Sequence, residues 1–361
     1  MAMLEKYLED LEKRIDSETE DKLLSEWREF TDGKFRGDIF CPQRTRKIPS
    51  KIKWPKVTVN QALFDVEQML LQQFSACSYC LENAGGAIMN VRSNYGSSII
   101  PSVLGAEDFI MADELNTLPT TKPLNGGKKT IMEMIKKGVP DLNTGCGAKV
   151  FETGKRFVEI LKDYPKARKY IKIYHPDFQG PLDNCEVLWG SELFIDIIDE
   201  PQLVKDFLSL ITETYTALMK KWTMIVPFEG EYSTHWNMLH KGHIMLRIDS
   251  AMNISPEMYG EFVVPYDQKL LDIFGGGGIH FCGRGDHYIE QLSKMKGVYA
   301  VPMSQPHLND MDKIYRNTVD KGIKLIGFSR DAAEKALAAG RNLRGNVHCW
   351  EAAGKNKQGG L

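Results

Sequence analysis

The spacing of apolar residues changes once along the chain, near residue 85. The first segment shows apolar residues at helical spacing, at Leu4, Leu8, Leu11 and Ile15. Another apolar helix is expected over about 61–75, and the segment 31–60, rich in Pro, Lys and Arg, is expected to wrap the surface. Residues 1–84 are therefore predicted to form an N-terminal helical extension that packs on the rest of the protein.

From residue 85 onward, short apolar strands alternate with longer helical segments. The expected strands are 87–96, 171–176, 242–254, 277–283, 298–304, 323–329 and 345–350. Strict alternation of strand and helix implies right-handed crossovers and a parallel sheet. No Rossmann-type glycine fingerprint favours an open sheet, and the Gly275–Gly278 run precedes a strand, which indicates a helix-to-strand turn. Residues 85–361 are predicted to form a TIM (β/α)8 barrel of the α/β class that carries the catalytic site.

Composition and charge exclude several classes of function. The net charge of -2 indicates no nucleic-acid partner, and no apolar run approaches the 18 residues of a membrane span. The acidic start MAMLEKYLEDLEKR does not have the pattern of a secretory signal, so a cytoplasmic location is expected. Seven cysteines, an odd number, then favour free thiols or metal ligands over disulfides. Cys77 and Cys80 have CxxC spacing but lie in a helical stretch without a second pair, which favours packing over chemistry.

Three residues suggest a metal site. His280 and Cys282 lie two apart at the C-terminal end of an expected strand, so their side chains share one face. Cys349 ends the last expected strand, whereas His348 should point to the opposite face. Two thiolates and one imidazole form a catalytic zinc pattern, in which the fourth position stays open for substrate. The alternative, that His280 and Cys282 are packed core residues, stays open on spacing alone.

Further polar residues follow other expected strands. Asp249 ends its strand and is a candidate to orient substrate or act as a general acid or base, with helix capping as the alternative. A polar and aromatic loop before that strand, and the exit of an earlier strand, supply candidate substrate-binding residues. They are Tyr174, His175, Tyr232, His235 and Trp236.

The segments HPDFQGPLDNCEVLWGSELFIDIIDEPQLVKDFL, RIDSAMNISPEMYGEFVVPY and GGIHFCG resemble the uroporphyrinogen decarboxylase superfamily. They look most like the methylcobamide:thiol methyltransferases and related corrinoid-dependent enzymes, over roughly residues 85–350. The resemblance implies zinc ligation by His280, Cys282 and Cys349, and a corrinoid carried on a partner protein. It further implies methyl transfer to or from a small substrate (a thiol, methanol, a methylamine or a methyl ether) by a monomer or a homodimer.

The resemblance leaves alternatives. True porphyrinogen decarboxylases bind substrate carboxylates with an arginine-rich motif, whereas the segment VRSNYGSSIIPSVLG offers Arg92 as its one cation, which disfavours a decarboxylase. Residues 1–85 have no counterpart in the family, and the chain ends soon after Cys349. A zinc lyase or hydrolase on the same barrel, and a non-catalytic barrel that binds a tetrapyrrole, remain the competing hypotheses.

Overall fold

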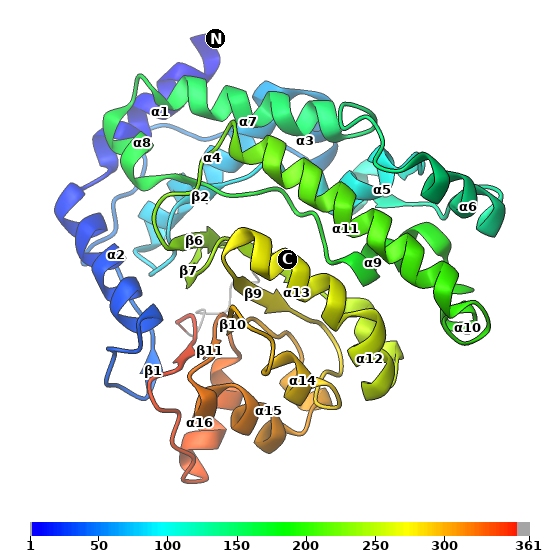
Figure 1. The fold of residues 1–361 in the computed structure, drawn as a ribbon. Helices are drawn as coiled ribbons and strands as arrows, with labels where there is room; N and C mark the ends of the chain where they lie inside the picture. Colours follow the sequence, from blue (N-terminus) through cyan, green and yellow to red (C-terminus); the bar gives the residue numbers. More distant parts are fainter. Residues whose placement is uncertain (1, 352–361) are drawn as a thin grey trace.

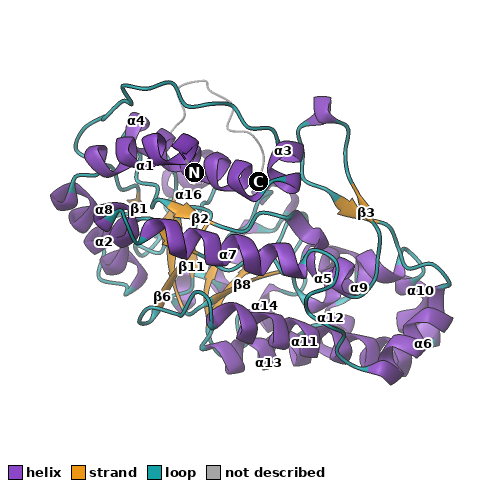
Figure 2. Ribbon diagram, turned by 90° about the horizontal axis from the view of Figure 1, so that it is seen from above, coloured by secondary structure: helices purple, strands orange, loops and turns teal. Residues whose placement is uncertain are grey.

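The computed structural model describes residues 2–351, in which helices surround a central set of strands (Figure 1; Figure 2). The helices are α1 (Ala2–Arg14), α2 (Ser17–Thr31), α3 (Val59–Phe64), α4 (Val66–Asn83), α5 (Ile99–Val103), α6 (Gly127–Lys137), α7 (Gly147–Leu161), α8 (Pro165–Tyr170), α9 (Pro181–Trp189), α10 (Leu193–Asp199), α11 (Pro201–Thr223), α12 (Pro256–Phe262), α13 (Val264–Phe274), α14 (Ile289–Leu292), α15 (Met311–Asn317) and α16 (Arg330–Ala338). The strands are β1 (Ile39–Phe40), β2 (Asn90–Val91), β3 (Asp108–Phe109), β4 (Thr120–Thr121), β5 (Lys172–Ile173), β6 (Tyr232–His235), β7 (Met238–Lys241), β8 (Ile244–Arg247), β9 (Gly277–His280), β10 (Val298–Val301), β11 (Lys324–Leu325) and β12 (Val347–His348).

Six of these strands form one parallel sheet in the order β1-β12-β11-β10-β9-β8. The strands β2 and β5 form a separate parallel pair, while β3–β4 and β6–β7 are antiparallel hairpins. The predicted α/β class with a parallel sheet and alternating helices is therefore confirmed. Among the described residues, continuous strand pairing does not join β5 to β8 or β1 to β2, so the sheet itself has six strands and not eight.

Local sequence explains where the helices of the second half begin and end. The Ser255 hydroxyl caps α12 by accepting from the Met258 N–H, and Pro256 occupies the first turn. Helix α13 ends at Gly275, which adopts the left-handed conformation with φ 76°. Gly275 and Gly276 thus form the predicted helix-to-strand turn, whereas Gly277 and Gly278 are the first residues of β9.

The expectation that residues 31–60 only wrap the surface is wrong for one short stretch. Ile39 and Phe40 pair with Val347 and His348, so this segment supplies the edge strand β1 of the parallel sheet. Two paired residues in a basic, proline-rich context are too short to give a periodic signal. Residues 1–84 therefore contribute a strand as well as helices.

The N-terminal helices are tied to the sheet by buried contacts. Leu8 and Leu11 of α1 share a buried apolar cluster with Phe74 of α4 and Phe157 of α7. Trp27 of α2 lies against Phe40 and His348 in another cluster. No helix among residues 2–351 combines the length and apolar character that crossing a bilayer requires.

A buried ion pair fixes the segment that follows β1 against α2. Arg44 Nε and Nη2 lie 2.6 and 2.8 Å from the two carboxylate oxygens of Glu20, and the two side chains are 1% and 5% exposed. Arg44 also donates to the Gly85 carbonyl. This bidentate pair holds the chain after β1 beside α2.

We predict that Arg44→Ala lowers the free energy of unfolding by about 3–5 kcal/mol, because it leaves the Glu20 carboxylate buried without its partner. Urea unfolding followed by circular dichroism measures the change. Arg46→Ala is the matched control, since Arg46 pairs with Asp16 while its side chain is 66% exposed, and it should cost no more than about 1 kcal/mol. Equal losses in the two variants would contradict the prediction.

Candidate metal centre

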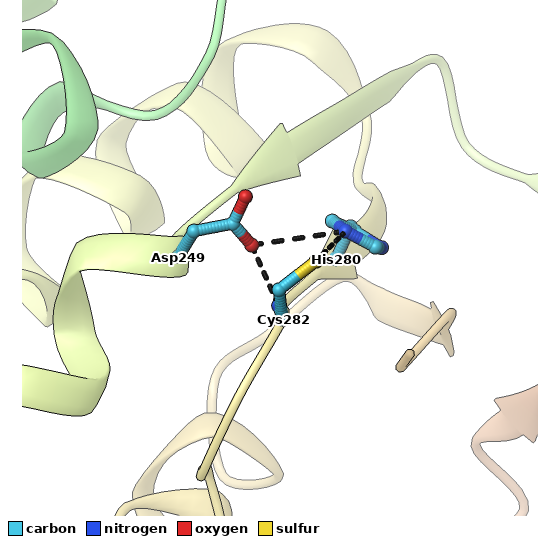
Figure 3. Close-up of side chains that lie close together, drawn as sticks. All are labelled: Asp249, His280 and Cys282. Atoms are coloured by element: carbon cyan, nitrogen blue, oxygen red, sulfur yellow. Dashed lines mark hydrogen bonds and ion pairs between the residues drawn. The ribbon is translucent and has the colours of Figure 1, made fainter. Parts of the chain in front are cut away.

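Three potential metal ligands meet at the C-terminal ends of β8 and β9 (Figure 3). Asp249 opens the short 3-10 turn that follows β8, His280 is the last residue of β9, and Cys282 lies two residues further on. The register that pairs Arg247 with His280 brings the two strand ends level. One ligand atom from each of the three side chains lies within 4.8 Å of the others. The structure thus brings His280, Cys282 and Asp249 into one group.

The distances within this group suit a zinc ion. His280 Nε2 lies 3.3 Å from Cys282 Sγ and 3.7 Å from Asp249 Oδ1. Ligands at the usual Zn–N, Zn–O and Zn–S lengths in a tetrahedral site lie roughly 3.3–3.8 Å apart. The Cys282 N–H donates to Asp249 Oδ1 at 2.6 Å, and Cys282 Sγ lies 3.3 Å from Ser304 Oγ. A small cation therefore fits between the three side chains with little rearrangement.

Burial sets the protonation states in the group. It lowers the pKa of His280 to about 4, although the nearby Asp249 carboxylate acts to raise that pKa. The imidazole is therefore neutral near neutral pH and keeps a lone pair. Burial raises the pKa of the Cys282 thiol, so metal binding must displace its proton. Behind them, burial and the Asp249 charge raise the pKa of Asp183 to about 7. Asp183 accepts from the N–H groups of Asp249 and Ser250 at 3.0 and 2.8 Å, which fixes the turn.

Cys349 lies elsewhere at the same edge of the sheet. It is fully buried after β12, its N–H donates to the Phe40 carbonyl at 3.1 Å, and burial raises the pKa of its thiol to about 12. The parallel register of β1 and β12 sets it beside Cys41, whose sulfur lies 3.7 Å from Arg330 Nη1. The structure does not bring Cys349 into the group of three, and its ligation of a metal stays a prediction. Because the strand β1 was not predicted, the sequence did not indicate that Cys41 lies beside Cys349.

The segment expected as a polar and aromatic loop is a hairpin, β6–β7, whose turn borders the metal group. Trp236 and Asn237 form its two-residue turn with φ of 47° and 65°, as a type I′ turn requires. The turn is held by Asn237, whose backbone carbonyl and side-chain amide both bond to Ile88. The Trp236 ring lies 5.2 Å from the His280 ring, so Trp236 borders the candidate metal site.

Three buried histidines below this turn are locked in neutral forms. His240 Nδ1 donates to the Lys241 carbonyl at 2.9 Å, so its Nε2 accepts from His235 Nδ1 at 2.6 Å. His175 Nδ1 donates to the Pro176 carbonyl, and its Nε2 accepts from the Met245 N–H at 3.1 Å. Nε2 of His175 thus joins the end of β5 to β8, and because Nδ1 is bonded to the next residue, neither ring nitrogen is left for a substrate.

Four of the predicted substrate-binding residues line a cavity that is separate from the metal group. Tyr174, His175, Tyr232 and His235 line a cavity of about 440 Å³, together with Trp222 and other residues of α7, α8 and α11. The residues of the metal group do not line it. Tyr232 donates to Asp32 Oδ1 at 2.7 Å. Of the five predicted residues, Trp236 is the one whose ring packs against the metal group.

Comparison with known proteins relates the fold to a methyltransferase. No described protein family and no curated protein matches the sequence. The structure is similar to that of a methyltransferase from Methanosarcina mazei, with a TM-score of 0.57 and 15% sequence identity over 81% of each chain. At this identity the similarity establishes the fold that the two proteins share.

We predict that the histidine pair makes stability pH-dependent. Burial lowers the pKa of His240 to about 4, so below about pH 6.5 the unfolded chain binds a proton that the folded protein does not. The stability conferred by neutral His240 is complete above that pH and falls as the pH drops. The difference in unfolding free energy between the protein and His240→Gln, whose oxygen can still accept from His235, should shrink by about 1.4 kcal/mol per pH unit from 6.5 towards 4.5.

Urea unfolding at a series of pH values measures this difference, with exposed His307 replaced by Gln as the matched control. A constant difference for His240→Gln across the range would contradict the prediction.

Proposed function

We propose that the protein is a zinc-dependent methyltransferase that moves a methyl group between a small substrate and a corrinoid on a partner protein. The observation that carries the proposal is the Asp249–His280–Cys282 group at the C-terminal ends of β8 and β9. This edge of a parallel α/β sheet is where catalytic groups gather. The fold shared with a methyltransferase adds support.

We further propose that the eight parallel strands form a TIM barrel. Besides the six-stranded sheet, β2 and β5 are parallel neighbours, and two contacts bridge the gaps on either side of this pair. His175, just after β5, accepts from the Met245 N–H of β8. Gln43, after β1, forms an isolated antiparallel bridge with Gly85, before β2. All eight strands would then direct their C-terminal ends towards one mouth.

In this proposal Asp249, His280 and Cys282 hold the ion. A zinc ion in such a site supplies a Lewis acid that activates a thiol or the oxygen of a methyl ether. The Asp249 side chain is 36% exposed and that of His280 is 6% exposed, so an incoming substrate can reach the carboxylate. The Asp249 carboxylate can take the proton that a thiol substrate releases, while Asp183 keeps the turn in place through the Asp249 and Ser250 N–H groups. The corrinoid protein would dock over this edge.

We predict one zinc per chain, with an affinity that rises about tenfold per pH unit between pH 6 and 8, because binding displaces one proton from the Cys282 thiol. The slope follows from the raised pKa of that thiol and the neutral state of His280. Titration against a competing chelator measures it. A slope near two would indicate that Cys349 also moves in as a thiolate ligand.

Variants test the same ligand set. Cys282→Ala should weaken zinc binding by more than about 100-fold, since losing a direct ligand costs more than losing an outer-shell partner. Cys349→Ala should retain zinc, because Cys349 lies outside the group that holds the ion in this proposal. Cys80→Ala is the matched control, because Cys80 lies on α4 outside the metal group. Full zinc occupancy in Cys282→Ala would exclude the proposed site.

We predict methyl transfer with zinc bound and none without it. The protein is incubated with methylcob(III)alamin and a panel of small thiols, and the cob(I)alamin spectrum reports transfer. The reverse assay supplies reduced corrinoid with methanol, methylamines, glycine betaine or methoxylated aromatic compounds. His280→Ala should be inactive in both directions. No transfer in either direction, with zinc bound and the natural corrinoid partner supplied, would leave a zinc lyase or hydrolase as the leading alternative.

A further inference from the structure

We propose that the cavity between β5 and β6 is a second binding site, which takes a flat heteroaromatic molecule with an N–H donor, of the kind that nucleobases and indoles carry. The site lies away from the metal group, so this inference goes beyond the proposed function and does not depend on it. It rests on the cavity, on a buried acceptor without a partner, and on backbone groups along the free edge of β6.

The cavity opens at the end of β8 opposite to the metal group. Its lining includes His243, the residue before β8, whereas the metal group follows Arg247, the last residue of β8. His243 and Arg247 are four residues apart, which is about 13 Å along a strand. The lining also includes Arg28, Arg168 and Glu229, which are exposed. A ligand can therefore enter from solvent without passing the metal group.

The shape and lining of the cavity suit a flat apolar ring. Its volume of about 440 Å³ is that of a small-molecule site. Apolar and aromatic side chains from several elements line it, among them Leu161 of α7, Ile173 of β5, Trp222 of α11 and Leu239 of β7. A ring that packs among these side chains removes apolar surface from water, which favours binding.

The buried end of the cavity holds an acceptor without a donor. His235 lines the cavity and is 2% exposed. Its Nδ1 donates to His240 Nε2, because His240 Nδ1 donates to the Lys241 carbonyl. Nε2 of His235 therefore carries a lone pair, yet it is inaccessible to solvent and has no partner within residues 2–351. Buried polar atoms in native proteins are almost always paired, so the missing partner is a donor.

Two polar neighbours of His235 cannot supply this donor. The ring of His175 lies 4.4 Å from that of His235, but both of its nitrogens are already bonded, to the Pro176 carbonyl and the Met245 N–H. Thr234 Oγ1 is itself buried without a partner. Successive side chains of a strand project to opposite faces, so the Thr234 hydroxyl faces away from the His235 ring. A donor for Nε2 must therefore come from a molecule in the cavity.

The free edge of β6 adds backbone donors and acceptors. The Gly242 N–H donates to the Glu231 carbonyl, and bonded pairs recur at every second residue of an antiparallel hairpin. Tyr232 and Thr234 therefore direct their N–H and C=O groups away from β7. Both residues line the cavity, and these groups have no backbone partner within residues 2–351. A ligand with adjacent donors and acceptors can pair with such an edge as another strand would.

These features together select the class of ligand. A heteroaromatic N–H supplies the donor that His235 Nε2 lacks, and the ring fills the apolar part of the cavity. Ring nitrogens or carbonyl oxygens can accept from the backbone N–H groups of β6. A hydrocarbon of the same shape would leave the buried Nε2 unpaired, which weakens its binding.

Calorimetric titration of the full-length protein tests the site with matched pairs that differ in the donor. Indole is compared with benzofuran, in which an oxygen replaces the N–H, and adenosine with purine riboside, which lacks the amino group. At least one donor should bind with a Kd below about 1 mM and about tenfold more tightly than its partner, the effect of one buried hydrogen bond. The two pairs distinguish an indole-type from a nucleobase-type ligand.

Variants place the ligand in the cavity. Val158→Trp, on α7, fills part of the cavity and should weaken the preferred ligand by more than about tenfold. Val139→Trp is the matched control, because Val139 is 40% exposed and does not line the cavity. His235→Phe removes Nε2, so it should reduce the preference for the donor to less than about twofold without weakening benzofuran or purine riboside. Circular dichroism should show that each variant is folded.

The outcomes separate this site from the proposed function. His280→Ala, which removes a residue of the metal group, should bind the preferred probe as tightly as the unaltered protein does. No binding of any of the four probes below about 1 mM, equal binding within both pairs, or unchanged binding in Val158→Trp would overturn the site. Donor-selective binding without any methyl transfer would support the site and count against the methyltransferase alone.

Discussion

The pairing of β8 with β9 is the constraint on which the candidate site depends. Arg247 lies opposite His280 in this register, so the residues that follow each strand, Asp249 and Cys282, emerge at the same level. Two glycines make the close approach possible. A Cβ on Gly277 would lie 1.8 Å from the Ile244 carbonyl oxygen, and one on Gly278 would lie 2.6 Å from the Met245 side chain. A shift of this register by one residue would turn the His280 side chain to the other face of the sheet and move it away from Asp249 and Cys282.

The parts of the fold that could be predicted from sequence are those with a strong period. The strands from β8 to β12 are short apolar runs between helices, three of which (α12, α15 and α16) have a side-chain N-cap, and each strand contains residues expected to be strand. The strand β1 and the hairpin β6–β7 were missed for different reasons. The first has two paired residues, and the second reads YSTHWN, in which buried polar and aromatic side chains hide the alternation. Tertiary contacts, such as those of Asn237 with Ile88, determine that these segments form strands.

The same division applies to the candidate site. The two-residue spacing of His280 and Cys282 and the strand-end position of Asp249 are local properties, so the sequence could suggest them. The pairing of Arg92 and Arg247 with Asp177 joins residues near three different strand ends. No local pattern relates Asp177 to residues that lie 85 and 70 positions away in the chain. The place of Cys349 beside Cys41 depends on β1 in the same way. Long-range neighbours of this kind need the fold before they can be assigned.

Groups of opposite charge lie on the two sides of the Trp236 ring. On one side of the indole, Asp249 and the Cys282 thiol, with Asp183 behind them, form an environment that favours a cation. On the other side, Arg92 and Arg247 both pair with Asp177. Trp236 can separate the two because the left-handed backbone of its turn, with φ 47°, holds the ring between Arg247 and His280.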